Sequence, residues 1–290
     1  MDILQLQYHI VQKQRSADWE NHKSAGGEVF LQMLEDGLRL LYRLPASGSL
    51  CGLDEIRFTR NLNTAEKLAQ FRHFIPESLL SETEFTGITL AVDPGAFTLV
   101  PESLFDEASA SDLLKLVAEV SDSEGIFHEK TGAGSVLVFS VAKEWLDWAS
   151  GIFQPAELKW TCHFSGMLRH FLTESSEKEL VLAHIGPSRL HCFGRKDGQF
   201  CFFNRYHFKS EQDLLYFFLL ALEQTGLDPE NALVQLCGSI MTGSAGFEKL
   251  NRYAGNLQFA IPGETDSLLP PAAGIRHPVY FDLLSLLSKP

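Results

Sequence analysis

The segment Gly238–Ala245 has residue types that could bind phosphate, because its glycines separate an apolar, strand-like run from a helix-like run. Gly238 and Gly243 have the spacing of a phosphate loop, in which backbone N–H groups approach the phosphate oxygens. Such a loop also needs a lysine and a metal-binding hydroxyl, and Ser244 and Ala245 stand at these two positions. We therefore favour a Gly-rich turn over a nucleotide site.

Four histidines could act as metal ligands together with Cys162 or Cys192: His163, His170, His184 and His191. None of them has a short chelating spacing such as His-x-x-x-His, in which one turn of a helix presents both rings. The sequence also lacks Gly-x-Ser-x-Gly, the pattern of a nucleophile elbow. The residue patterns therefore predict no metal site and no cofactor, and they identify no catalytic residue.

The charge and the cysteines narrow the class of protein. The 290 residues carry a net charge of −13, which disfavours sequence-independent binding to nucleic acid or anionic lipid, because both are polyanions. The apolar stretches are too short to span a membrane, and the N-terminus has no signal-peptide pattern. Five cysteines without a Cys-x-x-Cys pair are typical of reduced, buried thiols. We therefore expect a cytoplasmic protein that binds no nucleic acid and does not span a membrane.

Residues 180–240 show the clearest order of elements. Asp197-Gly198 lies between two apolar runs and predicts a type I′ hairpin turn, which needs positive φ at both residues. Ser210 and Asp213 have the spacing of a capping box, so a helix should begin there and end near Gly226. The expected elements are strands over 180–185, 189–193 and 199–203, a helix over 211–224 and a strand over 232–236. The apolar face of this helix is expected to contain Leu214, Phe217, Phe218, Ala221 and Leu222.

The N-terminal half of the chain repeats this order. A helix is expected to begin at the cap Asn63–Glu66 and to end near Phe74. Strands are expected over 29–34, 38–43, 50–59 and 88–92. Three strands, a helix and a fourth strand therefore occur twice, which indicates two similar α/β lobes.

Other segments flank the two repeats. Residues 4–10 alternate apolar and polar side chains, which predicts a strand that pairs at an edge of the chain's own sheet rather than with another molecule. Residues 12–27 are polar and indicate a linker. Trp145 and Trp148 lie three residues apart on an expected helix over 143–153 and should belong to the core. Further helices are expected to begin at 111 and to cover 279–287.

Three stretches of the chain resemble a known family. The sequence FNRYHFKSEQDLLYFFLLALEQTGLDPENALVQLCGSI, at 203–240, resembles the signature region of the bacterial domain-of-unknown-function family 3822. FTLVPESLF at 97–105 resembles that family's other recurrent stretch, and HPVYFDLL at 277–284 fits it as well. The resemblance covers 28–290 and supplies no activity.

The resemblance implies an actin-like, Hsp70-like ATPase type of fold. This is an α/β fold with two ribonuclease-H-like (actin-like) lobes, each a mixed β-sheet with helices, and a cleft between them. The expected domains are an N-terminal extension over 1–27 with an edge strand and linker, a first lobe over 28–178, and a second lobe over 179–290 with a C-terminal docking segment.

The resemblance also implies where remnants of a nucleotide cleft would lie. In active actin-like ATPases the first hairpin of each lobe holds phosphate with the pattern Asp-x-Gly, whose carboxylate positions Mg²⁺. The candidate cofactor-binding remnants are Asp36, Gly37, Gly186, Gly238 and Gly243.

The second hairpin departs from this pattern. His184 stands where an aspartate is expected, and Pro187 removes a backbone N–H donor. The adenosine-binding Gly-Gly pair would fall at Gly238-Ser239, so one glycine is missing. These departures indicate that the cleft is degenerate.

We therefore expect a non-catalytic, actin-like scaffold or protein-interaction module that binds a protein partner. The alternative is a divergent nucleotide-binding enzyme, an ATPase or a kinase-like protein, that uses Asp36 and the loop at 237–246. The sequence leaves the partner, the pathway and the oligomeric state open.

Overall fold

The structure is a computed structural model that describes residues 6–153, 157–173, 177–263 and 266–287. The chain divides into two compact units. Unit 1 consists of residues 1–130, 134–163 and 264–274, and unit 2 consists of residues 131–133, 164–263 and 275–290. The lobe boundaries at 27/28 and 178/179 stay a prediction.

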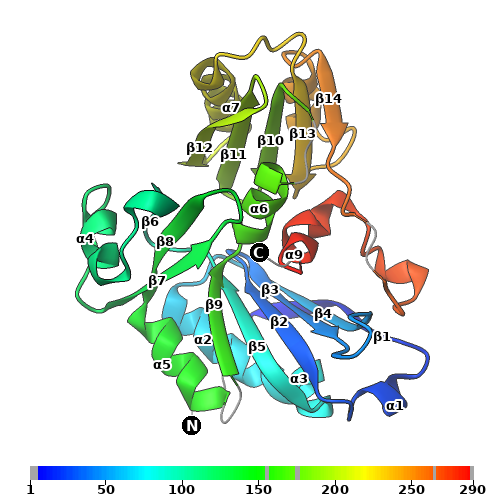
Figure 1. The fold of residues 1–290 in the computed structure, drawn as a ribbon. Coiled ribbons are helices and arrows are strands. Elements are labelled where there is room, and N and C mark those ends of the chain that lie inside the picture. Colours follow the sequence, from blue (N-terminus) through cyan, green and yellow to red (C-terminus); the bar gives the residue numbers. More distant parts are fainter. Residues whose placement is uncertain (1–5, 154–156, 174–176, 264–265, 288–290) are drawn as a thin grey trace. The chain divides into compact units, whose positions relative to one another are not determined.

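Unit 1 contains a six-stranded sheet in the order β1-β4-β3-β2-β5-β9 (Figure 1). Its strands are β1 (Tyr8–Arg15), β2 (Gly27–Met33), β3 (Gly37–Arg43), β4 (Leu50–Phe58), β5 (Phe85–Val92) and β9 (Glu157–Cys162). Neighbouring strands from β1 to β2 are antiparallel, whereas β2, β5 and β9 are parallel. Strands β2, β3 and β4 are buried along nearly their whole length. Most of their buried side chains are apolar, but buried polar and charged side chains occur among them: Gln32, Arg39, Asp54 and Glu55.

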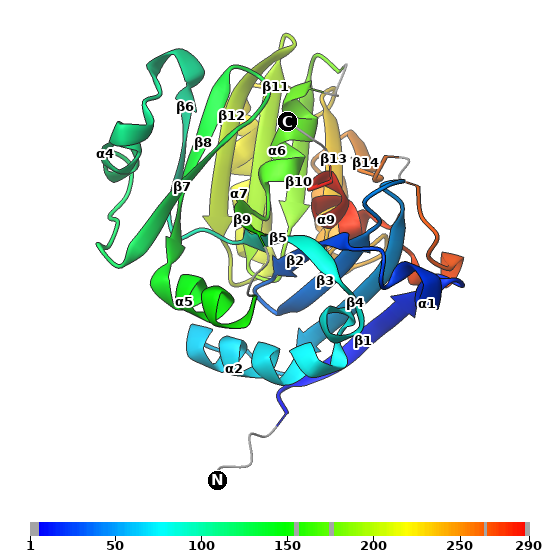
Figure 2. The same ribbon diagram turned by 60° about the horizontal axis from the view of Figure 1, so that its bottom comes forward.

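Unit 2 contains a five-stranded sheet in the order β12-β11-β10-β13-β14. Its strands are β10 (Leu180–Ile185), β11 (Arg189–Lys196), β12 (Gln199–His207), β13 (Leu233–Gly238) and β14 (Asn256–Phe259). Strands β10, β11 and β12 form an antiparallel meander, and β10, β13 and β14 are parallel. The helix α7 (Glu211–Thr225) covers one face, while α6 (Ser165–Thr173) and α9 (Phe281–Ser285) lie on the other (Figures 1 and 2).

The two large sheets share one topology. In each, an antiparallel meander is followed by a helix and then by a strand parallel to the first strand of the meander. This repeat confirms the two similar α/β folds that the order of elements predicts.

The turn and the caps of unit 2 follow the local sequence. Asp197 and Gly198 have φ of 52° and 77°, as a type I′ turn requires. The Ser210 side chain accepts a hydrogen bond from the N–H of Asp213 (3.1 Å). Gly226, with φ of 64°, ends α7 in the left-handed conformation.

The buried face of α7 differs from the predicted one at two positions, Phe217 and Thr225. Phe218 is fully buried, but Phe217 is only partly buried and stacks on Tyr206 with ring centroids 5.0 Å apart. The buried face ends instead at Thr225. The Phe217 ring contacts Tyr206 of the edge strand β12 and the neighbouring Tyr216 instead of entering the core.

The helix α2 (Thr64–Phe74) begins at the predicted capping box. The side chain of Asn63 accepts a hydrogen bond from the N–H of Glu66, and the carboxylate of Glu66 accepts one from the N–H of Asn63. Phe71 of α2 is buried against Trp145 and Trp148 of α5 (Lys143–Ile152), with ring centroids 6.0 Å away in both cases. Trp148 is therefore a core residue, as predicted, while Trp145 is partly buried.

A second, three-stranded sheet of unit 1 has the order β6-β8-β7. Its strands are β6 (Phe97–Pro101), β7 (Glu124–Lys130) and β8 (Ser135–Ala142), and α4 (Ala110–Lys115) packs beside them. The expected helix from 111 is therefore short, and β7 was not predicted from the sequence. No residue of β7 is fully buried, so its apolar pattern is weak.

The N-terminal segment is more ordered than a linker. The predicted strand begins at Tyr8 and continues to Arg15 as β1, which pairs with β4; residues 4–5 lie outside the described part of the chain. The polar stretch after it contains α1 (Trp19–His22). The side chain of Arg15 at the end of β1 contacts the buried carboxylate of Asp54, which composition alone does not reveal.

The remaining elements complete the two units. They are α3 (Leu79–Glu82), α8 (Ala245–Asn251) and short 3₁₀ helices at Ile75–Glu77, Glu102–Leu104, Glu107–Ser109, Pro271–Ala273 and Pro278–Tyr280. The C-terminal helix expected over 279–287 is the 3₁₀ turn followed by α9. All five cysteines are free, and four are buried as predicted, but Cys201 is exposed on the edge strand β12.

Candidate functional site

The first candidate remnant, Asp36 with Gly37, lies in the β2–β3 hairpin of unit 1. An oxygen of the Asp36 carboxylate lies 2.7 Å from a guanidinium nitrogen of Arg57, and its backbone oxygen accepts a hydrogen bond from the N–H of Phe58. A Cβ at Gly37 would lie 2.1 Å from the carbonyl oxygen of Ile56. The close approach of β4 therefore accounts for this glycine, and an ion pair with the protein's own arginine engages the carboxylate.

Gly186 and Gly238 lie together in unit 2, at the carboxyl ends of the neighbouring parallel strands β10 and β13. Gly238 has φ of 89°, and a Cβ there would lie 2.4 Å from the carbonyl oxygen of Ile185 and 3.0 Å from the His184 ring. The N–H of Gly186 donates to the carbonyl oxygen of Arg189 (2.8 Å), which closes the β10–β11 turn. Backbone geometry within the sheet thus requires Gly238 without any phosphate.

Gly243 lies in the turn before α8. Its φ is 81°, and the space around its Cα would be open to a side chain. The hydroxyl of Ser244 donates to the carbonyl oxygen of Met241 (2.8 Å) and accepts from the N–H of Phe247 (3.2 Å), so it caps α8. These contacts favour the Gly-rich turn over a phosphate loop.

The four histidines considered as ligands have different surroundings. In unit 1, Nδ1 of His163 lies 3.8 Å from a carboxylate oxygen of Asp93. In unit 2, His170 of α6 packs edge-on against Phe281 of α9. His184 and His191 are partners in the β10–β11 register, with ring centroids 5.7 Å apart. A search for helical spacing missed this pair, although the tight turn after Ile185 already places the two residues opposite each other.

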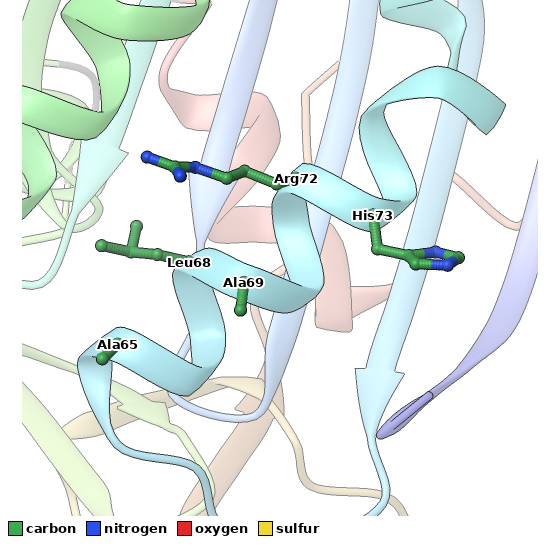
Figure 3. Close-up of a pocket in the computed structure, with 5 residues that line it drawn as sticks. All are labelled: Ala65, Leu68, Ala69, Arg72 and His73. Carbon is green, nitrogen blue, oxygen red and sulfur yellow. The ribbon is translucent and has the colours of Figure 1, made fainter. Parts of the chain in front are cut away.

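A groove of about 590 Å³ runs along the outer side of α2 (Figure 3). Leu68 and Arg72, one helical turn apart, point in the same direction, whereas His73 points to another side of the helix. The groove is lined by Ala65, Leu68, Ala69, Arg72 and His73. The ring of His73 is held by the hydroxyl of Tyr8, 3.4 Å from its Nδ1. The surface thus combines small apolar side chains with a cationic end.

A second hollow, of about 360 Å³, lies at the end of β11 and β12 in unit 2. It is lined by Arg189, Arg205, Tyr206 and His207. Arg189 and His207 are register partners, and the hydroxyl of Ser188 lies 3.2 Å from Nδ1 of His207. Two guanidinium groups and an imidazole can bind a carboxylate or a phosphate. No sequence motif links these four residues, because only the register of the hairpin brings them together.

In the described part of the chain, every helix is too short or too polar to cross a membrane.

The duplicated topology defines an actin-like ATPase fold. A protein of unknown function from Bacteroides thetaiotaomicron VPI-5482, with an actin-like ATPase fold, matches this chain with a TM-score of 0.73 at 15% identity, over 94% of this chain and 99% of that one. A structure of the PilM–PilN type IV pilus biogenesis complex matches with a TM-score of 0.60 at 14% identity, over 92% and 100%. The ethanolamine utilization protein EutJ from Carboxydothermus hydrogenoformans matches with a TM-score of 0.53 at 9% identity, over 90% and 89%.

At these identities the likeness shows the fold alone. No curated protein sequence matches the chain. The model of the family described as "Protein of unknown function (DUF3822)" matches residues 16–257, so the chain belongs to this family. Both the family and the fold that the sequence motifs implied are therefore confirmed.

Proposed function

We propose that this protein is a non-catalytic scaffold or protein-interaction module of the cytoplasm, built on an actin-like fold with a degenerate nucleotide site. The observation that carries this proposal is the groove along α2. Its apolar side chains and its cationic end are suited to a protein segment that combines apolar and acidic residues. A relative of the same fold whose structure is that of a complex, PilM–PilN, supports an assembly role by analogy of fold.

The geometry of α2 supports a docking role. Phe71 and Phe74 bury the inner side of the helix in unit 1, so α2 is anchored independently of its outer side. Ala65 and Ala69 on the outer side are small and leave room for a partner's backbone or side chain. A partner could bury Leu68 and pair with Arg72 without any rearrangement of the core.

The residues at the candidate nucleotide site support a non-catalytic function. The Asp36 carboxylate is engaged by Arg57, and His184 takes the place of the second aspartate. The second hairpin therefore has no carboxylate to position Mg²⁺ and water for phosphoryl transfer, and the Asp36 carboxylate of the first hairpin is already paired with Arg57.

A charge-reversal pair tests the docking surface. Tagged wild-type protein and the variants Arg72→Glu and Arg252→Glu are each used to capture partners from the native host, with bound proteins identified by mass spectrometry. Arg252 is an exposed arginine after α8 in unit 2, so it is the matched control. We expect one set of proteins to be retained by wild type and by Arg252→Glu, and lost by Arg72→Glu. Identical sets on all three proteins would contradict the role of α2.

The alternative, a divergent nucleotide-binding enzyme, is favoured by the basic hollow at Arg189 and Arg205, because paired guanidinium groups are common phosphate ligands. Melting with Mg-ATP separates the two. A Kd of about 10 µM would add about 2.7 kcal/mol at about 1 mM ligand, a shift of a few degrees. We expect a negligible shift. A shift of a few degrees that Asp36→Ala abolishes would contradict the scaffold proposal and favour the nucleotide-binding alternative.

A further inference from the structure

The β11–β12 hairpin is cationic, although the protein as a whole is acidic. Residues 189–207 contain four lysine or arginine residues and one carboxylate, Asp197, whereas the whole chain carries a net charge of −13. Asp197 lies in the turn that joins the two strands, at one end of the hairpin. Arg189, Arg205 and His207 lie at the other end, where they line the hollow of about 360 Å³. This end therefore carries positive charge with no carboxylate of the hairpin beside it.

The register of the hairpin places these side chains on one face. Arg189 is the partner of His207, and His191 is the partner of Arg205, so the four residues form a two-by-two block. In an antiparallel pair, opposite residues are about 4.5–5.5 Å apart, and diagonal ones such as Arg189 and Arg205 are about 7–8 Å apart. From that separation, two side chains as long as arginine can converge on one small ligand.

Three members of the block are accessible and the fourth is not. His191 is only 1% exposed, whereas Arg189 and Arg205 are half-buried and His207 is exposed. The hydroxyl of Ser188 lies 3.2 Å from Nδ1 of His207 and helps to hold the imidazole in place. Half-buried guanidinium groups attract an anion more strongly than fully exposed ones, because the effective dielectric constant around them is lower than in bulk water.

We propose that Arg189, Arg205 and His207 bind a small phosphate anion, of the class of orthophosphate and pyrophosphate. A guanidinium group donates two parallel hydrogen bonds to phosphate oxygens, and an imidazole can donate a further one. Two guanidinium groups match the double negative charge of a phosphate dianion, whereas a single one matches a carboxylate. The number of cationic groups therefore favours phosphate, and the site is independent of the docking surface on α2.

Side chains, rather than a glycine-rich backbone, form this site. In the preceding turn the N–H of Gly186 donates to the carbonyl oxygen of Arg189 (2.8 Å), and Pro187 has no N–H. The N–H of Phe208 donates to the carbonyl oxygen of Ser188 (2.9 Å). The guanidinium groups must therefore hold the anion, in contrast to a phosphate loop, where backbone N–H groups do so.

The hollow suits a phosphate anion better than a nucleotide. Tyr206, which also lines it, stacks on Phe217 with ring centroids 5.0 Å apart, and its hydroxyl donates to Oε1 of Gln224 (2.8 Å). This ring therefore packs toward α7 and is not presented to a base. The two arginines and the histidine supply charge rather than an apolar wall, so a nucleoside would add little to the affinity.

The test is calorimetric titration of the full-length protein with orthophosphate and with pyrophosphate, in metal-free buffer at low salt. Mg²⁺ is left out because it would neutralise part of the ligand charge that the arginines bind. We expect saturable binding of pyrophosphate with a Kd below about 1 mM, which weakens as NaCl is added. Arg205→Gln should weaken binding by about tenfold or more, because it removes charge-assisted hydrogen bonds. Arg252→Gln, which removes an exposed guanidinium elsewhere in unit 2, should bind like wild type.

Further ligands separate a phosphate site from a nucleotide site and from a carboxylate site. Tripolyphosphate and ATP, both without Mg²⁺, share a chain of three phosphates and differ by the adenosine. We expect ATP to bind no more tightly than tripolyphosphate, and acetate to leave pyrophosphate binding unchanged. ATP that binds tighter by about tenfold or more would assign the hollow to a nucleotide and overturn the proposal. Acetate that displaces pyrophosphate at equal concentration would overturn it too.

Two results with pyrophosphate alone would also overturn the proposal. One is wild-type protein with no saturable binding, a measurement that does not depend on any variant folding. The other is equal affinity of Arg205→Gln, Arg189→Gln and wild type, which would place the anion elsewhere. Melting of each variant without phosphate shows whether the substitution disturbs the fold, and Arg189→Gln repeats the test if Arg205→Gln is unfolded.

Discussion

The guanidinium of Arg15 lies 2.6 Å from the carboxylate of Asp54, whose side chain is completely buried. The same guanidinium also contacts Glu82 at 2.8 Å and lies over the ring of Trp19, 4.9 Å from its centroid. Burial raises the pKa of Asp54 above its usual value, although Arg15 acts in the opposite direction. Arg15 thus ties β1 to β4 and to α3 within unit 1.

Arg15→Met should destabilise the protein by about 3 kcal/mol, because it leaves a buried carboxylate without its cation. The N–H of Leu79, 2.7 Å from Asp54, still donates to this carboxylate. The loss of unfolding free energy should therefore lie near the lower end of the range for buried ion pairs that lose one partner. Urea unfolding of wild type and variant measures the difference. Arg60→Met, which breaks the exposed pair with Glu66, is the control and should scarcely change the midpoint. Equal losses of stability in both variants would show that the buried Arg15–Asp54 pair stabilises the fold no more than an exposed pair does.

Phe218→Ala should cost about 3–5 kcal/mol of unfolding free energy, because the ring is fully buried under the sheet of unit 2. Phe217→Ala removes the same number of atoms from a partly buried position and should cost clearly less. Denaturant unfolding of the two variants gives the comparison. If Phe217→Ala were the more damaging of the two, the orientation of α7 described here would be wrong.

Gly166→Ala should destabilise the protein by about 1–3 kcal/mol, because the added methyl group meets backbone atoms of α9 that cannot rotate away. Gly151→Ala is the matched control within a helix: nothing lies within 4 Å of the added Cβ on α5. That change should instead stabilise by about 0.5–1 kcal/mol, through the better helix propensity of alanine. Thermal unfolding of both variants measures these changes in stability. If Gly166→Ala were as stable as wild type, α6 and α9 could not be packed as closely as the structure shows.

The acid Glu82 should make part of the stability depend on pH. Its hydrogen bonds from Arg15 lower the pKa of Glu82 below its ordinary value of 4.5, with a smaller contribution from Trp19. A carboxyl group whose pKa is lowered in the folded state stabilises the fold above about pH 4.5, and this stabilisation is lost as the pH falls through the folded-state pKa. The stability difference between wild type and Glu82→Gln should therefore shrink between about pH 6 and pH 3. A difference that stays constant over this range would show that Glu82 has no coupling to Arg15.

Much of the fold follows from the local sequence. Asp197-Gly198 fixes a hairpin because few other residue pairs accept positive φ twice, and Asn63–Glu66 fixes the start of α2 because both side chains satisfy backbone N–H groups. The repeated order of strands and helices then limits the topology to a small number of arrangements. These signals act between residues close in sequence, so they can be read without coordinates.

The candidate sites could not be read in this way. Whether Asp36 faces a ligand or Arg57 depends on how β4 lies beside the β2–β3 hairpin, and Gly238 owes its conformation to Ile185 on a neighbouring strand. The sequence by itself determined the repeated order of strands and helices and the caps, because turn and cap signals act between neighbouring residues, and its motifs identified the family. Only the tertiary structure decided that His184 is the register partner of His191 and lies 3.5 Å from Asp282, because register and helix packing join residues far apart in the chain.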